Sequence, residues 1–138
     1  MQTCGPLYLD GLLKYAGDDP EKVRLFAAGF ITGQAEKAAL GASMAAMFRP
    51  SEIYRGMVQE VASDVACRYG LQYQMLGDEI WLYASGARML MWTLKQVQSN
   101  SPEWHTIRGF LCGVPSHEID VAFHRRKGYG EPYDRKEG

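Results

Sequence analysis

The stretch LQYQMLGDEIWLY, residues 71–83, decides the fold because the periodicity of the chain changes there. Apolar and polar residues alternate from Leu71 to Met75, as they do along a half-buried strand. Gly77 and Asp78 form a two-residue turn of the kind that closes a hairpin. We therefore predict one antiparallel hairpin over about residues 71–84. One of its faces carries Leu71, Tyr73, Met75, Ile80 and Leu82, and the other carries Gln72, Gln74, Trp81 and Tyr83.

Helical patterns precede the hairpin. Residues 7–15 predict a short helix that Gly17 ends, and Asp19-Pro20-Glu21 is a strong start for the next helix. The apolar face of that helix has helical spacing and consists of Val23, Phe26, Ala27, Phe30 and Ile31. Residues 38–48, rich in Ala and Met, predict a packing helix ended by Arg49-Pro50. Ser51 then begins a helix that runs to about residue 69 and stops at Gly70.

Two glycines interrupt the second of these helices. Gly29 and Gly33 lie one turn apart, and each costs a helix about 1 kcal/mol relative to Ala. We expect another helix of the same chain, formed by residues 38–48, to approach closely at this point. A contact between two copies of the chain is the alternative.

Helical patterns also follow the hairpin. We expect a helix over residues 85–97, with Leu90, Met91 and Leu94 on the buried side. Asn100-Ser101-Pro102-Glu103 is a second strong helix start, and we expect the next helix over residues 102–112. A last helix over residues 116–127 precedes a charged tail, residues 131–138. The fold class is therefore α+β, a mainly helical single domain over residues 1–138. Because helices can cover one face of the hairpin but its edges stay unpaired, a homodimer joined through the hairpin is a further hypothesis.

Composition limits the classes of function. The net charge of −1 disfavours a general nucleic-acid binder but allows a local basic face. Three widely spaced cysteines without a CxxC pair indicate reduced thiols and a cytoplasmic protein. The start of the chain lacks the basic and apolar segments of a signal peptide. No apolar stretch approaches the ~20 residues needed to span a bilayer, so we expect no membrane association.

Residues 102–127 have the spacing of a helix, a glycine turn and a second helix. Gly109, Gly113 and Ile119 occupy the positions that such a motif needs, so the segment resembles the helix-turn-helix families of bacterial regulators. Glu118 and Asp120 oppose this interpretation, because the start of a recognition helix faces the DNA polyanion. A structural helical hairpin is the favoured alternative.

Metal binding and catalysis have weaker support. His117 and His124 lie seven residues apart, which on a helix is about 10 Å and too far for one ion. Cys112 stands at a helix C-terminus, where the helix dipole disfavours a thiolate. We therefore expect no metal, no cofactor and no catalytic residue, and rank a small enzyme third.

Aromatic and basic residues are the remaining candidates for function. Aromatic side chains with arginine are typical of interface anchors and of base or nucleotide stacking. The candidate binding residues are Arg108, His117, His124, Arg125, Arg126, Lys127, Tyr129, Tyr133, Trp81 and Tyr83.

The segment IRGFLCGVP..EID..FHRRKGYG, residues 107–130, resembles an ending found in small accessory proteins of phages and bacterial mobile elements. This resemblance implies stoichiometric binding to a host protein, for example one of antiviral defence, or sequestration of a nucleotide-like ligand. The leading hypothesis is therefore a non-catalytic binding protein that inhibits a host protein. The runner-up is a helix-turn-helix DNA-binding regulator that uses residues 102–127.

Overall fold

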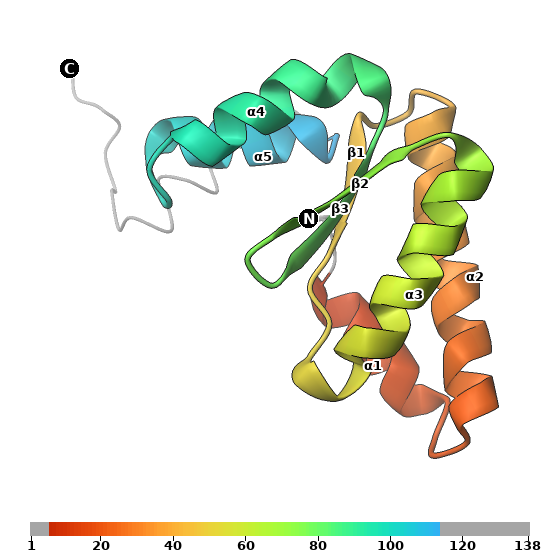
Figure 1. Ribbon diagram of the computed structural model, residues 1–138. Coiled ribbons are helices and arrows are strands. Elements are labelled where there is room, and N and C mark those ends of the chain that lie inside the picture. The colour runs from red at the N-terminus through yellow and green to blue at the C-terminus, as the bar shows by residue number, and fades with distance from the viewer. Residues whose placement is uncertain (1–5, 114–138) are drawn as a thin grey trace.

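Two groups of helices pack on opposite faces of a three-stranded antiparallel sheet (Figure 1). The computed structural model describes residues 6–113, with side chains from residue 9 onward. Its helices are α1 (Pro6–Tyr15), α2 (Pro20–Ala39), α3 (Glu52–Tyr69), α4 (Arg88–Gln96) and α5 (Pro102–Leu111). Its strands are β1 (Ala45–Phe48), β2 (Gln72–Leu76) and β3 (Glu79–Tyr83), and the short 3-10 helix η1 (Ser85–Ala87) precedes α4. The α+β class with a hairpin is confirmed.

The predicted hairpin forms the β2–β3 pair, with Tyr73 opposite Leu82 and Gln74 opposite Trp81. The alternation of its side chains is also confirmed. Ile80 and Leu82 pack with α1, α2 and α3, whereas Trp81 and Tyr83 pack with α4 and α5. Helices therefore cover both faces of the hairpin, not one.

Strand β1 is the main departure from the sequence prediction. The expected helix over residues 38–48 is wrong, because α2 ends at Ala39 and residues 45–48 pair with β3. All four residues of β1 are buried. A short strand buried on both faces has no polar alternation, so periodicity does not separate it from a buried helix. The helical propensity of Ala and Met yields here to sheet pairing.

Local capping signals explain where the helices begin and end. The Asp19 carboxylate accepts a hydrogen bond from the Glu21 N–H at 3.0 Å and caps α2. The Ser101 hydroxyl caps α5 in the same way, accepting from the Trp104 N–H at 3.2 Å. Gly70 ends α3 with a left-handed backbone, φ 69°. These three predicted boundaries are confirmed, and each satisfies backbone groups that a helix end leaves open.

The two faces of the sheet have separate cores. The core under α1–α3 is made of aliphatic and small side chains with one buried phenylalanine, and includes Leu9, Leu13, Ile31, Phe48, Val58, Val65, Ile80 and Leu82. The core under α4 and α5 is smaller and richer in large, polarisable side chains, and includes Met47, Trp81, Tyr83, Met91, Leu94 and Leu111.

The glycines of α2 are not at a close contact. A Cβ atom built on Gly29 or Gly33 meets nothing within 4 Å, and both residues are exposed. The expected close approach of a helix of the same chain is therefore wrong, because residues 38–48 leave the helical layer and join the sheet. The close approach occurs instead at Gly113, where a Cβ would lie 3.3 Å from the Ser43 Cβ.

The two cysteines within residues 6–113 differ in their state. Cys67 is a free and exposed thiol, whereas Cys112 takes part in a disulfide. The expectation of three reduced thiols is therefore wrong for Cys112. Spacing along the sequence does not limit which cysteines the fold brings together, since the pairing distance is a property of the folded chain.

Candidate functional site

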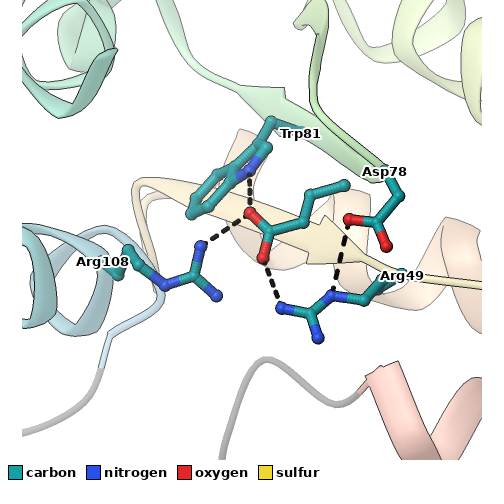
Figure 2. A network of polar contacts seen from close by, with 5 residues as sticks. Arg49, Asp78, Trp81 and Arg108 are labelled. Atoms are coloured by element: carbon teal, nitrogen blue, oxygen red, sulfur yellow. Dashed lines mark hydrogen bonds and ion pairs between the residues drawn. The ribbon is translucent and has the colours of Figure 1, made fainter. Parts of the chain in front are cut away.

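A buried carboxylate, Glu79, is the centre of a polar network on the α4–α5 side of the sheet (Figure 2). Arg108 of α5 donates to its Oε1 at 2.6 Å, and Arg49, directly after β1, donates to its Oε2 at 2.8 Å. The Trp81 indole N–H donates to Oε1 at 3.1 Å. The network therefore joins β3, the end of β1 and α5 through one side chain.

Two opposing effects set the ionisation of Glu79. Burial by itself raises the pKa of this carboxyl, because a charge loses its hydration inside the protein. Hydrogen bonds from Arg108 and Arg49, the charge of Arg108 and the Trp81 N–H outweigh burial and bring the pKa of Glu79 below its ordinary value. The hydrogen bond that Arg49 donates to Glu79 in turn raises the pKa of Arg49. Glu79 is therefore ionised at neutral pH.

Arg108 is held on several sides. Its guanidinium carbon lies 4.3 Å from the centre of the Trp104 ring and 5.6 Å from the centre of the Trp81 ring. Only 17% of its side chain is exposed. An ionised carboxylate held by two guanidinium groups is a poor proton acceptor for a substrate. The contact of Arg108 with Glu79 joins α5 to β3.

The predicted binding residues fall into three groups. Arg108 lies in the Glu79 network and has little surface left for a partner. Trp81 and Tyr83 lie on the face of the sheet that α4 and α5 cover, and both side chains are buried. The other predicted residues lie outside the residues that the structure describes: His117, His124, Arg125, Arg126, Lys127, Tyr129 and Tyr133.

The outward side of α4 carries a different group of aromatic and basic residues, which we call the α4 face: Arg88, Met89, Trp92 and Lys95. The Met89 side chain is 71% exposed and Trp92 is 55% exposed. The opposite side of the helix buries Met91 and Leu94 in the second core. The sequence held a signal for this face, since Met89 and Trp92 are large apolar residues that fall off the predicted buried stripe.

The part of the chain up to the end of the sheet and the part that follows it have opposite net charges. Residues 6–84 contain seven Lys and Arg against ten Asp and Glu, a net charge of −3. Residues 85–113 contain Arg88, Lys95 and Arg108 against Glu103, a net charge of +2. The α4 face therefore lies on the basic part of a molecule whose other helical layer is acidic.

The α2–α3 side offers an open, polar depression lined by Arg24 of α2 and by Gly56, Gln59, Glu60, Ser63 and Asp64 of α3. Arg24 and Glu60 form an exposed ion pair across it, at 3.0 Å. Exposed ion pairs of this kind contribute little to stability. Within residues 6–113 no group of three or more His, Cys, Asp and Glu side chains is placed to hold a metal ion.

None of the helices in the described part of the chain is both long and apolar enough to cross a membrane. No protein-family model, no curated protein and no solved structure matches the chain. The residues of the molecule itself therefore carry the argument for its function.

Proposed function

We propose that the protein is a non-catalytic binding protein that engages another protein through the α4 face. The observation that carries this proposal is the half-exposed Trp92, which lies on one side of a short helix with Met89, Arg88 and Lys95. Trp, Met and Arg are enriched in the centres of protein interfaces, and Trp and Arg are enriched among the residues that dominate binding energy.

The energetics favour this face as an anchor. Burying a large apolar side chain contributes about 1.5–3 kcal/mol, and Trp92 and Met89 still have most of that contribution to make. The helix that carries them is already fixed, because Met91 and Leu94 hold its other side in the core. A partner therefore meets an ordered surface and loses little binding energy to ordering it.

The resemblance of residues 107–130 to phage-type accessory proteins supports the same kind of role. Such proteins often work by stoichiometric binding, and the α4 face would supply a surface for it. Inhibition of a bacterial host protein is thus the proposed activity, and sequestration of a nucleotide-like ligand is its alternative.

Affinity capture from a bacterial lysate tests the proposal with two variants. Trp92→Ala removes the anchor of the α4 face, and Leu25→Ala removes an apolar side chain of α2 that is 70% exposed, against 55% for Trp92. We expect Leu25→Ala to retain the proteins that the wild type captures and Trp92→Ala to lose them. With the purified partner, Trp92→Ala should weaken Kd at least tenfold, about 1.4 kcal/mol. Equal capture by all three proteins of equal thermal stability would reject the α4 face.

Duplex DNA binding is the second candidate function. It is favoured by the net positive charge of residues 85–113 and by Gly113, which ends α5 with φ +80°, as a tight helical turn requires. Fluorescence anisotropy with a random-sequence duplex pool tests it at low and at physiological salt. Binding that weakens steeply with salt and is lost in Arg125→Glu/Arg126→Glu supports this function, and no binding at low salt rejects it.

A further inference from the structure

The hydrogen-bonding directions of the central strand β3 show which backbone groups of β2 point to the outer edge of the sheet. The Ala84 N–H donates to the Met44 carbonyl at 3.2 Å, so the backbone of Ala84 points toward the β1 side. Backbone groups of an antiparallel strand point alternately to its two neighbours. Ile80 and Leu82 therefore bond to β1, and Glu79, Trp81 and Tyr83 bond to β2.

The same alternation continues on β2. Gln74 is opposite Trp81 and exchanges hydrogen bonds with it. The N–H and C=O groups of Tyr73 and Met75 consequently point away from β3, to the outer edge of the sheet, since β2 is a terminal strand in the order β1-β3-β2. Among residues 6–113, no backbone group from another element bonds to Tyr73 or Met75.

Strand β2 lacks two of the devices that commonly prevent strand pairing, charge and proline. Residues 72–76, QYQML, contain neither a charged residue nor a proline. Tyr73 is 36% exposed. A neutral strand also meets no like-charge repulsion from a second copy of itself. A further strand is what such an edge accepts, because only a strand satisfies a row of backbone donors and acceptors.

We propose that two copies of the chain pair their β2 edges antiparallel about a two-fold axis, which joins two three-stranded sheets into one of six strands. The two-fold axis passes beside Gln74, so Tyr73 of each copy lies opposite Met75 of the other. Tyr73 and Met75 then exchange both N–H···O=C bonds. This register satisfies the outward groups of both residues in both copies, as a closed isologous contact does. The β2 edge is separate from the α4 face, so the dimer is independent of the proposed function.

Light scattering after size exclusion gives the first test. The wild type should have twice the mass of one chain at high micromolar concentration. Tyr73→Pro removes the outward N–H without removing a hydrogen bond to β3, so it should give the mass of one chain with unchanged circular dichroism. Tyr73→Thr removes the ring but keeps the N–H, and should keep the dimer mass.

Charge substitution at Gln74 tests the register and remains decisive if Tyr73→Pro fails to fold. Gln74→Lys and Gln74→Glu each place like charges opposite one another at the axis, so each variant alone should have the mass of one chain. An equimolar mixture should recover the dimer mass. A wild type with the mass of one chain overturns the proposal, and points to an unpaired edge or to a strand from another protein. A dimer that survives Tyr73→Pro, or both Gln74 variants, also overturns it.

Discussion

The two faces of the sheet are packed by different kinds of side chains. Against α1–α3 the sheet presents aliphatic side chains with Phe48, and the buried residues of that core are all apolar. Against α4–α5 it presents Trp81, Tyr83 and Met47, together with the buried carboxylate Glu79. The first face is held by apolar burial, whereas the second also depends on a charge network that fixes α5.

This difference assigns separate roles to the two layers. The α1–α3 layer has the larger core and an acidic sequence, and it supports the sheet. The α4–α5 layer has a smaller core and a basic outer side that carries Trp92. The polar network holds α5, and α5 packs against α4, so a substitution in the network should alter the layer that carries the candidate surface while leaving the other layer intact.

The largest change in stability is expected from Phe48→Ala in the larger core. Phe48 is fully buried and packs edge to face with Phe30, with ring centres 6.2 Å apart. Its removal should lower the free energy of unfolding by about 3–5 kcal/mol, measured by urea denaturation. The control, Phe110→Ala, removes an exposed phenylalanine of the other layer and should change stability by less than about 0.5 kcal/mol. Similar losses for both variants would contradict the assignment of the main core to the α1–α3 side.

A smaller loss is expected from Glu79→Gln. The amide keeps the size of the side chain but leaves the Arg108 charge, which is mostly buried, without its counter-charge. Urea denaturation at neutral pH should show a loss of about 3 kcal/mol, at the lower end for a broken buried ion pair. Arg49→Gln is the matched control and should cost about 1 kcal/mol or less, because 46% of the Arg49 side chain is exposed. Equal losses would mean that the contact with Arg49 accounts for the whole contribution of the Glu79 charge and that Arg108 adds nothing to it.

The pH dependence of stability separates the charge of Glu79 from its packing. Because the folded state has the lower pKa for Glu79, the ionised form stabilises the fold. This contribution is complete above the ordinary pKa of 4.5 and is lost as the pH falls through the folded value. The difference in unfolding free energy between the wild type and Glu79→Gln should therefore be constant near neutral pH and shrink below about pH 4.5. A difference that persists unchanged at pH 3 would assign the loss to packing.

Local patterns predicted the parts of the fold that local chemistry decides. The turn at Gly77-Asp78, the two hairpin faces and the caps at Asp19 and Ser101 all follow from neighbouring residues, and all are confirmed. Strand β1 could not be recognised in this way, because its four residues are buried on both sides and owe their conformation to pairing with β3.

The candidate site was harder to predict for a related reason. Arg49 and Arg108 stand 30 and 29 residues from Glu79, and only the fold brings the three together. Trp81 and Tyr83 were candidates for a binding surface because helices were expected on only one face of the hairpin. The exposed pair Met89 and Trp92 could have been found from the helical spacing of residues 88–96, since it lies off the buried stripe.

The smallest change in stability is expected on the outer side of α2, in the acidic α1–α3 layer. Gly33 lies in the helical backbone of α2 with open space where a Cβ would stand. Gly33→Ala should therefore raise the free energy of unfolding by about 0.5–1 kcal/mol, through a less flexible unfolded chain and a better helix. Gly113→Ala is the control and should lower it, because Gly113 has φ +80° and a Cβ would press on Ser43. If Gly33→Ala destabilised the protein instead, another surface would have to pack against α2, and that side would be a contact face like the α4 face.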